Sequence, residues 1–379
     1  MNISDVKLNN CNNIYNYLYK KRAATKREIA FELMLSLPTV TNTLTDLKEL
    51  GLVASDTKIV SKTGGRNPVA YSFIPDARVA VGLDISRHHI KSIVVDLDGN
   101  TVQYITRKID YTRTDDYLKI LGDEVDNIVT KANLDSQKIL GVGIAVPGLV
   151  EHEQGYVVDG RVIDNTGMTC ADFSKYITFK TKLIHDSVAA GVAEFTKHPE
   201  LKTACYVNAC NSFGGSVLVN DSIYLGDGLY SCEIGHLNLV PNGKKCYCGQ
   251  SGCFDSYCST EVLAVHTQGD LSVFFQKLEE GDVQITEVWE TYLDNLARAM
   301  TEIRMMFGSK IIIGGDIGAE IDKYMGVLRD KVDALSPFGE KCEPYLVSSY
   351  NNKKAIAAGA AMFFIREFLG SDLYGNVTT

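Results

Sequence analysis

One histidine and three cysteines gathered in a short segment constrain this chain more than any other feature of its sequence. An imidazole and three thiolates form a common tetrahedral ligand set for a structural zinc ion. The segment supplies such a set as His236, Cys246, Cys248 and Cys253, with Gly249 and Gly252 for tight turns. Four protein ligands leave no open position for a catalytic water, so we expect structural zinc. The alternative is that these cysteines are small buried hydrophobic residues.

The charge of the chain is unevenly distributed. With 379 residues the chain is long enough for two or three domains, and its formal net charge is −9. Residues 1–75 nevertheless contain ten lysines and arginines against six aspartates and glutamates. That split favours a small end that binds a polyanion, attached to an acidic body.

The sequence shows no sign of secretion or membrane insertion. The N-terminus lacks the basic-then-apolar profile of a signal peptide, and no apolar stretch reaches the roughly 18 residues of a membrane helix. We therefore expect a cytoplasmic protein without a membrane partner. In that reducing compartment, ten cysteines favour free thiols and a metal site rather than disulfides.

The first 50 residues show the pattern of three short helices. Helical spacing of apolar residues predicts the first over residues 11–22. Thr25 and Glu28 form a capping-box pattern that begins the second, and Ser36 begins the third. A short helix with small polar groups near its N-terminus suits insertion into the DNA major groove. The predicted DNA-contacting residues there are Ser36, Thr39, Thr41, Asn42 and Thr45.

A hairpin follows these helices and predicts a wing. Its turn, residues 63–68, is glycine-rich and carries Arg66, which we expect to contact a phosphate or the minor groove. The alternative for Arg66 is an ordinary solvated surface residue. Residues 1–75 are thus predicted to form a winged helix-turn-helix DNA-binding domain, and the alternative is an unrelated three-helix packing module.

From residue 79 the pattern becomes that of an α/β protein. Three apolar runs, residues 79–85, 90–97 and 102–109, predict strands, and a helix near 114–132 precedes a strand over 139–146. The chain then repeats this order. We expect a second domain over residues 76–379, with a first lobe at about 79–190 plus the C-terminal helix and a second lobe at about 191–350.

Several motifs in this second domain resemble those of one family. Glu233, Gly235 and His236, followed by Cys-x-Cys-Gly-x-x-Gly-Cys, resemble the signature of the ROK group of sugar kinases and sugar-responsive repressors. Pro147-Gly148, His185-Asp186 and Gly314-Gly315 are also similar, so the resemblance spans about residues 79–370. It implies a two-lobed actin-like ATPase fold, which the repressor members of the family carry behind a winged helix.

The resemblance also implies a sugar pocket. Asp186 matches the catalytic base of the kinases, Glu233 and His236 match residues that take sugar hydroxyls, and Asp255 stands where Glu is usual. Asn165 matches a family asparagine near the sugar, whereas His185 replaces the usual Asn. His236 thus has two possible roles, zinc ligand and sugar contact, and one imidazole can serve both through its two ring nitrogens.

Both phosphate-binding loops of the kinase pattern are altered. Family kinases have Asp followed by Gly-Gly-Thr, whereas here Asp84 is followed by Ile-Ser-Arg-His-His. The second loop, Gly-Thr-Gly-x-Gly-Gly in the family, reads Asn-Ala-Cys-Asn-Ser-Phe-Gly-Gly over residues 208–215. Side chains stand where bare backbone would approach phosphate. We therefore expect a protein that is not an enzyme.

The resemblance as a whole implies a sugar-responsive repressor similar to the xylose-type members of the family. Its expected partners are operator DNA and a monosaccharide inducer, and helix-turn-helix proteins read paired half-sites, so a homodimer or possibly a tetramer is expected. One alternative is an ATP-dependent sugar kinase with Asp186 as general base. Another is a constitutive DNA-binding protein that has lost its ligand.

Overall fold

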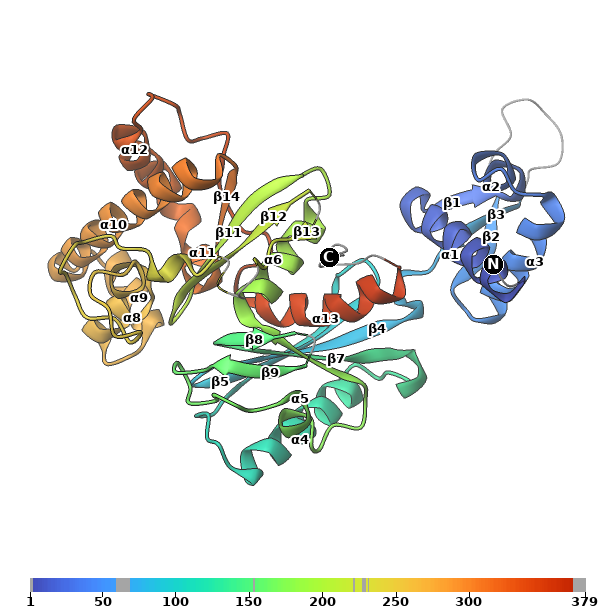
Figure 1. The fold of residues 1–379 in the computed structure, drawn as a ribbon, viewed down its shortest axis with the longest axis horizontal. Helices are drawn as coiled ribbons and strands as arrows, with labels where there is room; N and C mark the ends of the chain where they lie inside the picture. Colours follow the sequence, from blue (N-terminus) through green and yellow to red (C-terminus); the bar gives the residue numbers. More distant parts are fainter. Residues whose placement is uncertain are drawn as a thin grey trace.

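The protein consists of a small N-terminal domain and two larger lobes (Figure 1). The computed structural model describes residues 3–58, 69–152, 154–220, 222–226, 230 and 232–370. The predicted wing turn and its Arg66 lie outside these residues, as do parts of other loops. The domain limits at residues 75 and 76 stay a prediction.

The N-terminal domain has the helix and strand order of a winged helix. Its elements are α1 (Ile3–Lys21), β1 (Ala23–Thr25), α2 (Lys26–Glu32), α3 (Leu37–Glu49), β2 (Val53–Lys58) and β3 (Val69–Phe73), and its three-stranded sheet has the order β1-β3-β2. The predicted capping box is confirmed, because the Thr25 side chain accepts from the Glu28 amide while the Glu28 carboxylate accepts from the Thr25 amide. Ser36 caps α3 as predicted. The first helix begins at Ile3, earlier than the predicted residue 11.

The first lobe is built on a five-stranded sheet of order β10-β7-β4-β5-β6. Antiparallel β4, β5 and β6 are followed by parallel β7 and β10. The elements are β4 (Val79–Ile85), β5 (His89–Asp96), β6 (Thr101–Lys108), α4 (Asp115–Lys131), β7 (Ile139–Val146), β8 (Leu149–Glu151), β9 (Tyr156–Asp159), α5 (Cys170–Phe173) and β10 (Thr181–His185).

The second lobe repeats this topology with a sheet of order β13-β12-β11-β14-β15. Again three antiparallel strands precede two parallel ones. Its elements are β11 (Thr203–Ala209), β12 (Phe213–Val219), β13 (Ser222–Ile223), α7 (Asp255–Cys258), α8 (Glu261–Ala264), α9 (Leu271–Glu279), α10 (Val283–Phe307), β14 (Lys310–Gly314), α11 (Gly315–Ile321), α12 (Met325–Leu335) and β15 (Leu346–Ser348). The predicted two-lobed α/β architecture is therefore confirmed.

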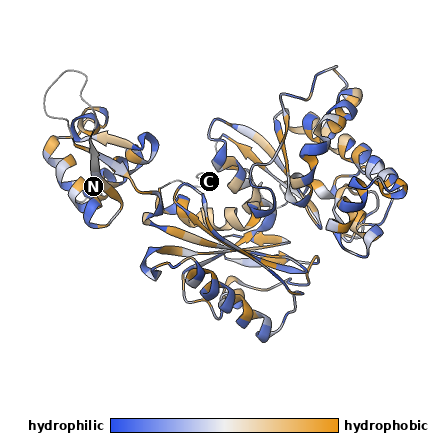
Figure 2. Cartoon of the chain, turned by 180° about the vertical axis from the view of Figure 1, so that it is seen from behind, coloured by the Kyte–Doolittle hydropathy of each residue, from blue (hydrophilic) through white to orange (hydrophobic). Residues whose placement is uncertain are grey.

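Two helices, α6 (Asp186–Lys197) and α13 (Ala355–Phe368), pack against each other between the two sheets (Figure 1). The strands below α13 are largely hydrophobic (Figure 2). Glycines allow the close approach: a Cβ on Gly143 of β7 would lie 2.0 Å from the Ala360 carbonyl oxygen, and one on Gly359 would lie 1.6 Å from that of Ala189. The backbones of β7, α13 and α6 thus touch where no side chain intervenes.

The winged helix shares its hydrophobic core with this helix pair. Buried residues of α1 and α3 join those of α6 and α13 in one continuous cluster. The Tyr15 ring lies 5.5 Å from Phe73 and 5.9 Å from Phe368 at the end of α13. Arg22 also pairs with Asp98 of the first lobe at 2.6 Å. The C-terminal end of α13 is therefore a docking point for the N-terminal domain.

We expect Gly359→Ala to destabilise the protein by at least about 2 kcal/mol, because the new methyl group would collide with backbone that cannot rotate away. The matched control is Gly326→Ala in the exposed part of α12, where a Cβ meets nothing within 4 Å. That change should be neutral or stabilising by up to about 1 kcal/mol. Thermal denaturation midpoints compare the two variants. Equal midpoints would contradict the close packing of α13 on α6.

Candidate metal and ligand site

The four predicted metal ligands form one cluster. Their ligand atoms all lie within 4.8 Å of one another, in the set His236, Cys246, Cys248 and Cys253. His236 ends the short 3-10 helix Ile234–His236, and the cysteines come from the following knuckle. Gly249 and Gly252 turn this knuckle with φ angles of 96° and 89°, which favour glycine.

The spacing within the cluster fits a tetrahedral zinc ion. Two thiolates at about 2.3 Å from such an ion lie about 3.8 Å apart, and the sulfur atoms of Cys248 and Cys253 are 3.7 Å apart. The Nδ1 atom of His236 lies 3.7 Å from the Cys246 sulfur, close to the expected separation of a nitrogen and a sulfur ligand. His236 therefore turns Nδ1 toward the cysteines and Nε2 away from them.

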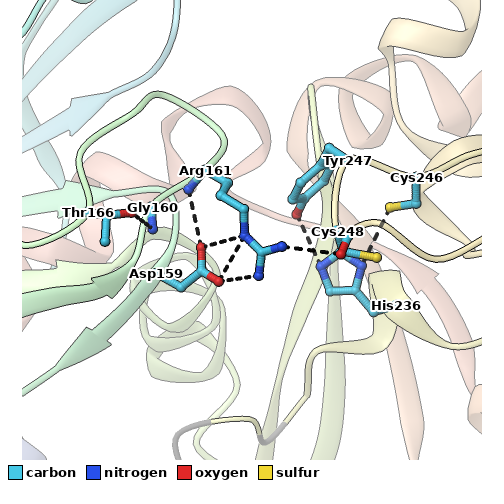
Figure 3. A network of polar contacts seen from close by, with 8 residues as sticks. All are labelled: Asp159, Gly160, Arg161, Thr166, His236, Cys246, Tyr247 and Cys248. Atoms are coloured by element: carbon cyan, nitrogen blue, oxygen red, sulfur yellow. Dashed lines mark hydrogen bonds and ion pairs between the residues drawn. The ribbon is translucent and has the colours of Figure 1, made fainter.

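The second imidazole nitrogen of His236 has a partner that sequence reasoning missed. Nε2 lies 3.2 Å from the hydroxyl of Tyr247, the residue between the first two cysteines (Figure 3). Burial lowers the pKa of His236. The signal in the sequence was the position of Tyr247 inside the Cys-x-Cys motif, and that position does not predict where the Tyr247 hydroxyl points.

The predicted sugar residues Asp186 and Asp255 are buried and partly hydrogen-bonded. Asp186 begins α6 and accepts from the Ser187 amide at 2.6 Å, and its carboxylate lies 3.2 Å from Nε2 of His185. Burial lowers the pKa of His185, but the hydrogen bond to Asp186 and the charges of Asp186 and Glu233 together outweigh burial and raise that pKa overall. Asp255 accepts from the Phe213 amide at 2.8 Å, and burial raises its pKa to about 6.

The surroundings of the predicted sugar residue Asn165 differ from those of the other predicted sugar residues. Burial raises the pKa of Tyr247, and the charges of Asp255, Glu233 and Asp186 raise it further. With His236, whose Nε2 contacts the Tyr247 hydroxyl, these three residues are called the group around Tyr247. Asn165 is fully buried; it donates to the Pro147 carbonyl at 3.3 Å, and its Oδ1 has no hydrogen-bond partner among the described residues.

A cleft of about 1380 Å³ separates the lobes on the side of the altered phosphate loops. Asp186 lines it, whereas Asn165, Glu233, His236 and Asp255 do not. Arg87, from the first altered loop, also lines it but donates to the Val162 carbonyl at 2.6 Å. The guanidinium of Arg87 is therefore already engaged by protein.

A lysine stands among carboxylates in this cleft. The ammonium of Lys91 lies 3.5 Å from Asp84 of the first lobe and 3.9 Å from Asp316 of the second. Burial raises the pKa of Asp84 to about 6, although Lys91 lowers it and Asp186 and Asp316 raise it further. An internal cation thus bridges the two lobes.

The glycines that remain in the second loop serve packing. A Cβ on Gly214 would lie 2.5 Å from the Ser187 hydroxyl, and one on Gly215 would lie 2.7 Å from both the Ile234 side chain and the Tyr206 carbonyl oxygen. The amide of Gly315 donates to the Tyr206 hydroxyl at 3.2 Å. These backbone groups are committed to protein contacts, so their presence is no sign of a phosphate site.

Helix α3 lies on the side of the winged helix away from the lobes (Figure 1), and the predicted DNA-contacting residues belong to this helix or, for Ser36, cap it. Ser36, Asn42 and Thr45 are exposed, and Thr39 and Thr41 are half-buried. Ser36 and Thr39 share a hydroxyl hydrogen bond of 2.8 Å, and Thr45 donates to the Thr41 carbonyl. Asn42 is therefore the amide on this face without a local role among the contacts described.

Across the described segments, no helix combines the length and hydrophobicity needed to cross a bilayer.

Comparisons with known proteins agree with this architecture. The xylose repressor of Bacillus spizizenii is 24% identical over 323 residues, 81% of this chain and 82% of the repressor. The DNA-binding transcriptional dual regulator NagC of Escherichia coli K12 is 23% identical over 352 residues, 86% of this chain and 84% of NagC.

Solved structures share the fold. A ROK family transcriptional regulator, described as a homologue of the E. coli MLC protein, superposes with a TM-score of 0.72 and 21% identity over 96% of each chain. A ROK family glucokinase from Streptomyces griseus, in complex with glucose and AMPPNP, has a TM-score of 0.62 and 19% identity over 75% of this chain and 98% of the kinase. The ROK family sequence model matches residues 80–367. The chain belongs to the ROK family.

Proposed function

We propose that this protein is a sugar-responsive, DNA-binding transcriptional repressor of a carbohydrate-utilisation operon, acting in the cytoplasm. The observation that carries the proposal is a winged helix joined through one hydrophobic core to a ROK body. The names of the xylose repressor and NagC relatives support the same function.

On the DNA side, α3 would enter the major groove. Its exposed Asn42 has the donor and acceptor pair that can read adenine, and the hydroxyls of Ser36, Thr39, Thr41 and Thr45 can contact phosphates or base edges. Arg66 on the wing would contact a phosphate or the minor groove. A homodimer, or a tetramer of two dimers, would place two such helices on paired half-sites.

On the sugar side, the group around Tyr247 has the chemistry that a monosaccharide inducer needs. Asp186, Glu233 and Asp255 offer acceptors, and Nε2 of His236 offers a directional ring nitrogen. Asn165 stays a predicted sugar contact from the family resemblance, although its side chain is fully buried in this structure. Zinc held by the four knuckle ligands would fix the orientation of His236 and the fold of the knuckle.

Sugar and DNA would be coupled through the helix pair. Asp186 begins α6, α6 packs on α13, and the end of α13 contacts Tyr15 of the winged helix. A change in lobe angle on sugar binding therefore reaches the DNA-binding domain by direct contact. Coupling of about 1 to 3 kcal/mol would change operator affinity by roughly 5 to 150 fold.

The first prediction concerns inducer release. Fluorescence anisotropy on a duplex from the upstream region of the gene, titrated with pentoses, hexoses and amino sugars without ATP, should show release by one sugar. Glu233→Ala should bind the duplex as tightly but lose this release, because a hydroxyl acceptor is gone. Operator binding that ignores every sugar in both proteins would favour a constitutive DNA-binding protein instead.

The second prediction concerns the metal. Cys248→Ser should lose zinc and lower the thermal denaturation midpoint, because a tetrahedral site rarely tolerates loss of a thiolate. Metal content by mass spectrometry checks this, with Cys170→Ser outside the cluster as the control that keeps its zinc. Stoichiometric zinc in Cys248→Ser would contradict the assignment.

The third prediction concerns catalysis. Because Lys91 supplies a fixed cation among Asp84 and Asp316, and Arg87 is bound to a carbonyl, we expect no sugar-stimulated ADP formation from Mg-ATP. A coupled ADP assay over the same sugar panel measures this. Sugar-dependent ADP formation that disappears in Asp186→Asn would establish the alternative, a sugar kinase with Asp186 as general base.

A further inference from the structure

The knuckle is held to the first lobe by one arginine. Arg161 follows β9, and its guanidinium donates to the Cys248 carbonyl of the second lobe at 3.2 Å (Figure 3). Asp159 fixes the direction of this guanidinium: its two carboxylate oxygens accept from Nε at 3.0 Å each, and a second guanidinium nitrogen also donates to it. The backbone next to Tyr247 is therefore anchored from the opposite lobe.

Tyr247 lies partly at the surface and also contacts His236. The residue is 48% exposed, yet its hydroxyl lies 3.2 Å from Nε2 of His236. The two rings meet edge-on, with centroids 5.2 Å apart and planes inclined by 73°. The ring is thus partly exposed, while its hydroxyl contacts the half-buried imidazole of His236.

A tyrosine hydroxyl has the same hydrogen-bonding groups as a sugar hydroxyl, one donor and two acceptor lone pairs. The place that it occupies, on Nε2 of His236, is one that a hydroxyl of a polyhydroxylated ligand would fill. A partly exposed aromatic ring also offers a flat apolar face to the C–H face of a sugar ring. Tyr247 can therefore both compete with a ligand and contact it.

We propose that Tyr247 is a specificity-determining residue of the inducer pocket, whose hydroxyl holds the place of one sugar hydroxyl on Nε2 of His236 until the inducer displaces it. This inference rests on the proposed function. A sugar binds only if one of its hydroxyls replaces that of Tyr247 while its ring fits against the aromatic face. Sugars with a different hydroxyl pattern gain no compensation for the hydrogen bond that they break.

Two substitutions separate the competing hydroxyl from the contacting ring. Tyr247→Phe keeps the ring and leaves Nε2 of His236 without its partner, so sugar should bind more tightly, by about fivefold for one hydrogen bond. Tyr247→Ala also removes the aromatic contact face, so sugar should bind more weakly to it than to Tyr247→Phe. The ratio of dissociation constants between the preferred sugar and the other sugars should also be smaller in Tyr247→Ala than in the wild type. A purely structural tyrosine would not give tighter binding on loss of its hydroxyl.

The experiment is isothermal titration of the full chain with D-xylose, D-glucose and N-acetylglucosamine, for the wild type and both variants. Tyr350→Phe, an exposed tyrosine remote from the knuckle, is the matched control and should match the wild type. Equal zinc content and equal thermal midpoints check that the variants are folded. Sugar binding by the wild type with unchanged affinity and preference in Tyr247→Phe would overturn this inference alone. Binding of no sugar by any of the proteins would overturn the proposed function as well.

Discussion

The close contact of α13 with β7 and α6 is the constraint on which the rest of the structure depends. At Gly143 and Gly359 backbone meets backbone, so α13 cannot tilt or slide without opening a void or a collision, and packed interiors resist both. The same helix ends against Tyr15 of the winged helix. One helix therefore connects the packed α6–α13 pair between the lobes with the N-terminal domain.

The charge of Lys91 explains why a kinase-like cleft need not be a nucleotide site. Three aspartates near one another would repel, and a buried carboxylate is costly unless a cation lies close. The ROK family glucokinase from Streptomyces griseus was solved with glucose and AMPPNP. Here the cation is the ammonium group of the Lys91 side chain, which lies between Asp84 and Asp316 of the two lobes. As part of the chain, it is always present.

The parts of this architecture that were predictable from sequence are those set by local physics. Thr25 and Glu28 form their capping box because both partners lie within one helical turn, and the three knuckle cysteines converge because two glycines turn a short loop. Apolar runs in the sequence predicted the repeated order of the strands. The Lys91 bridge, the Arg161 anchor and the contact of Tyr15 with Phe368 join residues far apart in sequence. No periodicity or spacing encodes those pairs, because they depend on how the lobes and helices dock.

The two ring nitrogens of His236 have different partners. Its Nδ1 faces the cysteines, and a ring nitrogen that binds a metal must be deprotonated, so the ring proton would then sit on Nε2. The partner of Nε2 must in that case accept, as the Tyr247 oxygen at 3.2 Å can. The knuckle would thus set the polarity of this contact as well as its place: a hydroxyl that replaces that of Tyr247 must accept from His236. That requirement is stricter than shape alone, and under the proposed function it would tie the choice of inducer to the cluster of His236, Cys246, Cys248 and Cys253.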